Sequence, residues 1–237
     1  MTSCYFPPCC TTPTQHWTLP NLPEEVALLS CQFFPEQWQP EHSALFGLAP
    51  IKAIAKRQSE YLAGRFCARE ALSHLGFAGV LVGATEHRAP HWPDNTTGSI
   101  THSQGFAVAL AAPSSVLLSA GIDLEKELSW ERAAKVAKHV HTPSELEHWQ
   151  TLTPQEQCFF TTLAFSAKES LYKALHPLVN QSFFFQDAEL VSYNQHGHVS
   201  LRLRKTLSPA WTANTLIEGL FSAQDSFVLT AVLIAQP

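Results

Sequence analysis

Three carboxylates in this sequence have a spacing that could bring them together around a metal ion. Asp123 and Glu125 lie two residues apart in the segment GIDLE, which follows the apolar run SSVLLSA. Residues two apart in an extended chain point to the same face, so both acids would share one face of a strand. Glu169 could add a third carboxylate from a predicted helix packed across that strand. Carboxylate oxygens are the ligands that Mg²⁺ prefers in proteins.

Two lysines near Glu169 could balance the charge of a phosphorylated ligand. Lys168 directly precedes it, and Lys173 follows it by four residues, which is the favourable order for a Glu–Lys pair on a helix. Acids and lysines in this arrangement suggest phosphoryl chemistry. A simpler alternative is a strand that emerges into solvent and a solvated helix face with one salt bridge. These residues alone leave both alternatives open.

A second group of residues, in the first half of the chain, could bind a polyanion. Arg57 and Arg65 are eight residues apart on a predicted helix, so both could border one groove. Arg88 and His102 lie in the segment that follows. Arginines on helices are usually surface residues, and a lone histidine in a turn is usually a packing residue. With the three acids, however, this group predicts a site for a phosphorylated ligand and a metal ion at the junction of two halves.

The elements that must position these residues are predicted in two halves of similar organisation. Each half has strands and one long helix, which the apolar periodicity indicates. The predicted elements are a strand at 26–34, a helix at 51–76, two strands flanking 103–105, a strand at 116–125, a helix at 154–175, and four strands at 188–193, 198–205, 215–223 and 226–235.

Two helix starts have matching capping signatures. Thr142-Pro143-Ser144-Glu145 and Thr153-Pro154-Gln155-Glu156 each place Thr at the N-cap, Pro at the first helical position and Glu at the third. This pattern satisfies two backbone N–H groups and sets the first turn of a helix. The second of these starts opens the long helix that carries Glu169.

The order of elements predicts an α+β protein with antiparallel sheets. We expect an irregular N-terminal arm at residues 1–18, a first α+β half at 19–114, and a second half at 115–237 that carries the three acids. The best internal boundary is the Pro-Ser-Ser segment at residues 113–115.

Composition restricts the class of protein. The 237 residues carry a formal net charge of −5, which argues against non-specific nucleic-acid binding. No apolar run is long enough to span a membrane, and no secretory signal opens the chain. The six cysteines form no CxxC pair. These features are typical of a reduced, cytoplasmic protein.

The motifs that contain these residues resemble those of a known family. GIDLE and FSAKESLYKAL are similar to the paired signature of the 4′-phosphopantetheinyl transferase superfamily. YLAGRFCAREAL and RAPHWPDNTTGSITHS resemble the branch that includes enterobactin synthase component D and related activators of carrier proteins. The likeness covers roughly residues 20–180, with departures at Asn95 and Thr101. Asn tolerates a left-handed turn, so the loop geometry is more affected than the chemistry.

The resemblance implies a fold and a reaction. The expected fold is pseudo-two-fold α+β, with a small antiparallel sheet and a long helix in each half and coenzyme A bound between the halves. The expected reaction moves the 4′-phosphopantetheine arm of coenzyme A onto a serine of an apo acyl or peptidyl carrier protein and releases adenosine 3′,5′-bisphosphate. It depends on Mg²⁺, with Mn²⁺ as a substitute, and the expected enzyme is a monomer without a nucleic-acid partner.

The resemblance also implies roles for single residues. The metal ion would be held by Asp123, Glu125 and Glu169. Glu169 and Lys173 would be catalytic, with Glu169 helping to deprotonate the carrier serine. The residues expected to contact coenzyme A are Lys168, Lys173 and His102 at its phosphates, and Arg57, Arg65 and Arg88 near its 3′-phosphoadenosine end.

Two other functions remain as alternatives at this stage. A metal-dependent phosphodiesterase or nuclease would use the same acids and lysines, but the net charge of −5 argues against it. A non-catalytic module that binds carrier proteins would not need every acid and lysine in place. The sequence also leaves open which carrier protein is served, which arginine contacts the 3′-phosphate, and whether Phe183–Phe185 form a docking surface or part of the core.

Overall fold

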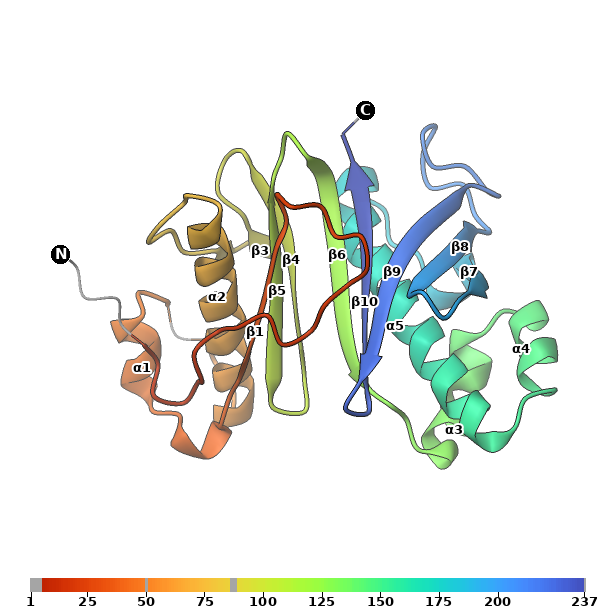
Figure 1. Ribbon diagram of the computed structural model, residues 1–237, viewed down its shortest axis with the longest axis horizontal. Coiled ribbons are helices and arrows are strands. Elements are labelled where there is room, and N and C mark those ends of the chain that lie inside the picture. The colour runs from red at the N-terminus through yellow and green to blue at the C-terminus, as the bar shows by residue number, and fades with distance from the viewer. Residues whose placement is uncertain (1–5, 50, 86–88, 237) are drawn as a thin grey trace. The chain divides into compact units, whose positions relative to one another are not determined.

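The computed structural model describes residues 6–49, 51–85 and 89–236, and the chain forms two compact units. The first unit consists of Leu22–Leu118 together with the terminal segments, and the second consists of Ser119–Ala235 together with Leu19–Asn21. The division falls inside a strand, and the predicted boundaries at residues 18/19 and 114/115 stay predictions. Each unit is described by itself below (Figure 1).

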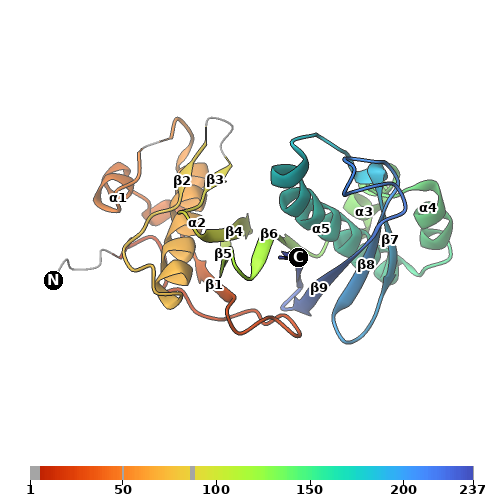
Figure 2. The same ribbon diagram turned by 90° about the horizontal axis from the view of Figure 1, so that it is seen from above.

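The first unit is a three-stranded antiparallel sheet covered by a long helix, α2 (Ala55–His74). The strands lie in the order β1-β5-β4, and their bounds are β1 (Ala27–Gln32), β4 (Thr96–Ser103) and β5 (Phe106–Pro113). Helix α2 packs along β5 and β1, as Figure 2 shows from above. Its buried apolar side chains and those of the strands form one core cluster. The predicted helix and hairpin of this half are therefore confirmed.

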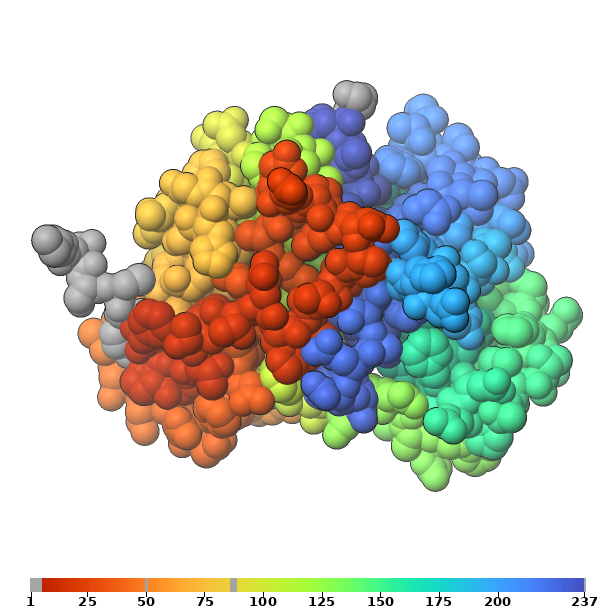
Figure 3. All heavy atoms as spheres, in the orientation of Figure 1, coloured from red at the N-terminus to blue at the C-terminus, as the bar shows by residue number. Residues whose placement is uncertain are grey.

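Shorter elements complete the first unit. They are η1 (Pro35–Gln37), α1 (Pro40–Leu45), β2 (Gly83–Ala84) and β3 (Pro90–His91). The segment before β1 is held to that strand by isolated antiparallel bridges, Cys10 to Phe33 and Thr14 to Ser30. It lies on the surface of the unit, where Figure 3 shows it in red and orange-red. From Phe6 onward the predicted arm therefore contributes backbone pairing to the sheet.

The second unit is a five-stranded antiparallel sheet in the order β6-β10-β9-β8-β7. The strand bounds are β6 (Leu117–Lys126), β7 (Ala188–Tyr193), β8 (His198–Leu203), β9 (Leu216–Gln224) and β10 (Phe227–Ala235). All four strands predicted after the long helix are present. With one antiparallel sheet and one long helix in each unit, the α+β fold class is confirmed.

Helix α5 (Pro154–Val179) packs on this sheet mainly against β10. The predicted apolar stripe lies in the core of the unit, from Phe160 to Leu175. The opposite stripe is not a solvated face, because Thr162 and Ser166 are fully buried. The alternative of a solvent-facing polar stripe is therefore wrong, and α5 is enclosed on both sides.

Two short helices precede α5. Both predicted capping boxes are present: Thr142 begins α4 (Pro143–Trp149) and Thr153 begins α5. A further helix, α3 (Trp130–Val140), was not predicted, although Ser129 caps it through a side-chain oxygen. A short 3-10 helix, η2 (Phe185–Asp187), joins α5 to β7. Within the described residues, no helix combines the length and the apolar character needed to cross a membrane.

Candidate active site

Asp123 and Glu125 lie towards the end of β6, and Glu169 lies in the middle of α5. Only 5% of the surface of Asp123 is exposed, whereas Glu125 and Glu169 are half-buried. Asp123 is therefore not part of a strand that has emerged into solvent. Alternation along the strand places Ile122 and Leu124, both fully buried, on the other face.

The three carboxylates interact electrostatically. Burial, followed by the charge of Asp123 and more weakly that of Glu169, raises the pKa of Glu125 to about 7. Burial, followed by the charge of Asp123, raises the pKa of Glu169. Both shifts have the same origin, since negative charges close together in a partly desolvated place disfavour ionisation. The residues predicted from the two motifs thus lie close enough to influence one another.

Lys173 supplies the positive charge beside these acids. Its Nζ donates to Oδ1 of Asp123 at 2.7 Å and to the backbone oxygen of Ile122 at 2.9 Å. The ammonium lowers the pKa of both Glu125 and Glu169 against the larger effects that raise it. The helical spacing from Glu169 predicted a pair between Lys173 and that residue, but the ion pair forms with Asp123 on the strand.

Close packing of α5 on β6 brings the acids of the two elements together. Gly121 has no space for a side chain, because a Cβ there would lie 1.9 Å from the backbone oxygen of Ser170. Hydroxyl groups fasten the same contact: Ser119 donates to the backbone oxygen of Ala174 at 2.7 Å, and Ser166 donates to that of Asp123 at 3.0 Å. The glycine and serines therefore fix the height of Glu169 above the strand.

The donor set has the chemistry of a magnesium site, although its side chains do not form a closed cage. Asp123, Glu125 and Glu169 offer hard carboxylate oxygens, and the pKa of about 7 at Glu125 reflects negative charge that a cation would relieve. In the part of the chain that the structure describes, no group of three or more His, Cys, Asp or Glu side chains is placed so that it could hold a metal ion. Mutual repulsion explains the separation of three acids that have only Lys173 for compensation. The residues fit the ion by type, and rotation of their side chains would be needed to enclose it.

Lys168, which precedes Glu169, does not join the acids. Its Nζ lies 2.7 Å from Oε2 of Glu145, and both side chains are 2% exposed. Its expected contact with a coenzyme phosphate stays a prediction.

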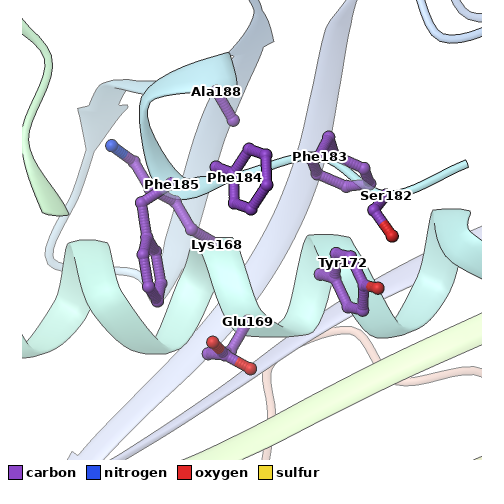
Figure 4. A pocket seen from close by; sticks show the side chains of 8 residues that line it. All are labelled: Lys168, Glu169, Tyr172, Ser182, Phe183, Phe184, Phe185 and Ala188. Atoms are coloured by element: carbon purple, nitrogen blue, oxygen red, sulfur yellow. The ribbon is translucent and has the colours of Figure 1, made fainter. Parts of the chain in front are cut away.

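A pocket of about 300 Å³ opens beside Glu169 (Figure 4). Its lining residues are Lys168, Glu169, Tyr172, Ser182, Phe183, Phe184, Phe185 and Ala188. The Phe183–Phe185 segment resolves into separate roles, since Phe183 is buried in the core and Phe184 is 73% exposed. The pocket therefore combines aromatic walls with a carboxylate at one side.

In the first unit, Arg57 and His102 are brought together. Nη1 of Arg57 donates to Nε2 of His102 at 2.5 Å and to Oε2 of Glu60 at 3.2 Å. The ion pair between Arg57 and Glu60 agrees with their spacing of three residues on a helix. The side chain of Arg57 is 53% exposed, so its remaining donors are accessible to an external anion.

Arg65 differs from Arg57 because its guanidinium is used inside the fold. Its Nε donates to the backbone oxygen of Val82 at 3.3 Å, and its Nη2 donates to that of Gly83 at 3.2 Å. The guanidinium also lies over the ring of Tyr61, and only 6% of the residue is exposed. The idea that Arg65 lacks internal partners is therefore wrong. Arg88 lies outside the described residues.

Sequence reasoning did not identify the polar residues that surround the acids. Ser170 shares a buried hydrogen bond with Thr230 of β10, and Arg132 of α3 influences the pKa of Glu125. The serine spacing on α5 was visible in the sequence as part of the polar stripe, but it was interpreted as solvent-facing. Arg132 carried no signal, because the helix that bears it was not predicted.

Two family descriptions match the chain along most of its length. The 4′-phosphopantetheinyl transferase N-terminal domain matches residues 43–112, and the 4′-phosphopantetheinyl transferase superfamily matches residues 119–232. The second match contains all three acids and both lysines discussed above.

Similar proteins carry the same description. The 4′-phosphopantetheinyl transferase Svp of Streptomyces mobaraensis is 35% identical, over 78% of this chain and 76% of the relative. The 4′-phosphopantetheinyl transferase Npt of Nocardia iowensis is 31% identical, over 78% of this chain and 85% of the relative. Enterobactin synthase component D of Salmonella typhi is 33% identical, over 81% and 76% respectively. The chain belongs to the 4′-phosphopantetheinyl transferase superfamily and is an enzyme of that class.

Proposed function

We propose that this enzyme transfers the 4′-phosphopantetheine arm of coenzyme A to a serine of an apo carrier protein and releases adenosine 3′,5′-bisphosphate. Asp123, Glu125 and Glu169 would hold Mg²⁺, or Mn²⁺ in its place. The observation that carries the proposal is the electrostatic coupling of these carboxylates beside Lys173. The names of the relatives support the reaction.

Glu169 is the proposed base of the transfer. A serine hydroxyl is a weak nucleophile until a positioned group removes its proton. The raised pKa of Glu169 makes its carboxylate a stronger base than an exposed glutamate. As the proton moves to Glu169, the serine oxygen attacks the phosphorus that bears the pantetheine arm. The bond from that phosphorus to the bridging oxygen breaks, and the adenosine bisphosphate leaves with the electron pair.

Charge on the leaving group requires compensation near the acids. Bound Mg²⁺ would act as a Lewis acid on the diphosphate oxygens. Lys173 is proposed to donate to the same diphosphate, since its ammonium is part-exposed and now pairs with Asp123. A cation held by Asp123 would take over that pairing and leave the ammonium of Lys173 available to phosphate.

The pocket beside Glu169 is the proposed place for the pantetheine arm. Its aromatic side chains, among them Tyr172 and Phe184, suit the apolar parts of the arm, and Ser182 offers a hydroxyl for its amide groups. An arm in this pocket would reach Glu169, which lines the same pocket. The proposal thus places the base next to the group that is transferred.

The first unit is proposed to bind the phosphates of the nucleotide part. Arg57 has accessible donors and lies beside His102, and both side chains can donate to phosphate oxygens. Arg65 and Arg88 were expected to share this role. For Arg65, the hydrogen bonds to Val82 and Gly83 leave only part of the guanidinium for a ligand.

Intact mass spectrometry tests the proposed reaction. Several apo carrier proteins are incubated separately with the enzyme, coenzyme A and Mg²⁺, and with each component omitted in turn. At least one carrier is expected to gain the mass of one phosphopantetheinyl group, only when all components are present. Absence of this gain for every carrier, or a gain that persists in excess chelator, would contradict the proposal.

A further inference from the structure

Lys168 and Glu145 form an ion pair in the interior of the second unit. Nζ of Lys168 lies 2.7 Å from Oε2 of Glu145, with each side chain 2% exposed. Lysine and glutamate are almost never so completely buried unless they are paired. The loss of one partner would leave an uncompensated charge in the interior, which is strongly destabilising.

Further hydrogen bonds connect this ion pair to three neighbouring elements. Nζ of Lys168 also donates to the backbone oxygen of Val140 at the end of α3, at 2.8 Å. Glu145 accepts from the backbone N–H of Thr142 at 2.6 Å through Oε2, and from that of Leu190 on β7 at 2.7 Å through Oε1. The pair therefore joins α5 to the end of α3, the start of α4 and the edge strand of the sheet.

The ammonium of Lys168 is directed away from the acids. Figure 4 shows the side chains of Lys168 and Glu169 leaving α5 in opposite directions, with Glu169 on the side of β6. For Lys168 to reach a coenzyme phosphate, its ammonium would have to leave Glu145 and Val140. Glu145 would then remain buried with its charge uncompensated. This geometry favours an internal role for Lys168.

Glu169 depends on the same turn of α5. The two residues are consecutive, and both line the pocket beside the acids. A small rotation or shift of this turn would move the carboxylate of Glu169 relative to Asp123. Misplacement of a reacting group by about 1 Å can cost roughly 10²-fold in rate.

We infer that Lys168 is a positioning residue: through its ion pair with Glu145 it fixes the turn of α5 that presents Glu169, and it does not bind the coenzyme. This inference rests on the proposed function of Glu169. The pair itself can be tested without any activity, because it predicts non-additive effects on stability.

The test compares Lys168→Met, Glu145→Gln, the double variant Glu145→Gln/Lys168→Met, and Lys135→Met as a control on the exposed face of α3. Melting temperature, coenzyme A affinity by calorimetry, and kcat and KM are measured well below the melting temperatures. Lys168→Met is expected to melt at a lower temperature and to lose at least roughly tenfold in kcat, with coenzyme A affinity within about twofold of wild type. The double variant is expected to recover most of both losses, because no unpaired charge remains. Lys135→Met should match wild type.

Three results would overturn the inference. Coenzyme A affinity that falls about tenfold in both Lys168→Met and the double variant would identify Lys168 as a phosphate ligand. A double variant no more stable or active than Lys168→Met would exclude the coupling to Glu145. An unchanged kcat in a destabilised Lys168→Met would limit the lysine to a structural role.

Two further outcomes are covered by the same set of variants. If Lys168→Met does not fold, the double variant decides. If wild type neither binds coenzyme A nor transfers its arm, the proposed function fails, and the melting temperatures still test the ion pair.

Discussion

Glu125 shows at the residue scale how neighbouring charges define this site. A glutamate in water has a pKa near 4.3, whereas burial and the charges of Asp123 and Glu169 raise that of Glu125 to about 7. Around neutral pH its carboxyl is therefore only partly ionised while no cation is bound. A bound divalent cation would favour the ionised form, and this competition makes Glu125 a sensitive test of the metal proposal.

We predict that Glu125→Gln separates the stability of the fold from its response to the metal ion. The variant removes one of three mutually repelling carboxyl groups, so its melting temperature without metal should equal or exceed that of wild type. Wild type should be stabilised by added Mg²⁺ in differential scanning calorimetry, and the variant should lose most of this shift. Glu147→Gln, a substitution of an exposed residue on α4, should keep it. An undiminished Mg²⁺ shift in Glu125→Gln would argue that Glu125 does not hold the ion.

His141 makes the fold sensitive to acid. Burial, and to a smaller extent the charge of Lys168, lowers the pKa of His141 from 6.5 to about 3. Between these values the unfolded chain binds a proton that the folded chain does not, so stability is lost as the pH falls from about 6.5 towards 3. The loss from this residue should be on the order of 3–5 kcal/mol.

The variant His141→Phe tests this acid sensitivity. A phenyl ring retains the stacking on Phe160 and cannot be protonated. We expect urea unfolding free energies of the variant to fall less steeply with decreasing pH than those of wild type, whereas His139→Gln, a change at an exposed position of α3, should follow wild type. Parallel pH profiles for His141→Phe and wild type would show that the acid sensitivity arises elsewhere.

Single residues of the site could be predicted from the sequence where local spacing decides their position. The alternation in GIDLE correctly separated Asp123 from the buried Ile122 and Leu124. The partners of Lys173 and Arg65 could not be predicted, because both are backbone or carboxylate groups far away in the sequence. Side-chain partners across elements depend on tertiary packing, which helical spacing does not encode.

At the scale of elements, the contact between β6 and α5 determines the geometry of the site. The strand and helix approach so closely at Gly121 that the backbone of Ser170 occupies the place of a side chain. Buried hydroxyl groups of Ser166 and Ser170, which bond to Thr230, continue this contact to β10. Small residues at the interface thus allow the helix to hold Glu169 beside Asp123.

We predict that Gly121→Ala disrupts this contact. A Cβ 1.9 Å from a backbone oxygen cannot be accommodated without moving α5 away from β6. The free energy of unfolding should fall by about 3 kcal/mol or more, as expected for overpacking against backbone, and any protein that folds should lose transfer activity. Gly83→Ala serves as the control for stability, since its Cβ would meet nothing nearer than 3.9 Å. Equal denaturation midpoints for Gly121→Ala and wild type would contradict this account of the contact.

Most of the elements could be predicted because their local signals are strong. Thr142 and Thr153 carry complete capping boxes, and both helices begin where these predict. Helix α3 was overlooked, although Ser129 caps it and its apolar residues face one side. The burial of Ser166 could not be inferred, since a polar residue on a helix is usually exposed, and only the small residues of the packed strands permit it.

At the scale of the whole molecule, two units each combine an antiparallel sheet with one long helix. This fold class followed from the order of helices and strands, which periodicity reveals. The exact division between the units did not, because it falls within β6, where the chain continues without a loop. A composition change such as that at residues 113–115 marks a turn more reliably than it marks a domain boundary.

Net charge gives a prediction for the molecule as a whole. With a formal charge of −5, the enzyme should repel a phosphate backbone at long range, whereas local cations such as Arg57 and Lys173 can still bind a small phosphorylated ligand. Calorimetry at physiological salt should detect binding of coenzyme A and none of a random DNA duplex. Comparable affinity for both ligands would favour the alternative of a nucleic-acid-processing phosphodiesterase.

The central claim is that the carboxylate of Glu169 takes the proton of the carrier serine, and Glu169→Gln tests it most directly. The amide keeps the shape of the side chain and one oxygen but cannot act as the base. Initial rates of transfer to an accepted carrier and coenzyme A affinity are measured for wild type, Glu169→Gln and the surface control Glu147→Gln. We expect kcat of Glu169→Gln to fall by roughly 10²-fold or more while coenzyme A affinity changes by less than about threefold. A kcat close to that of wild type would contradict the claim, and so would a collapse of affinity with kcat preserved.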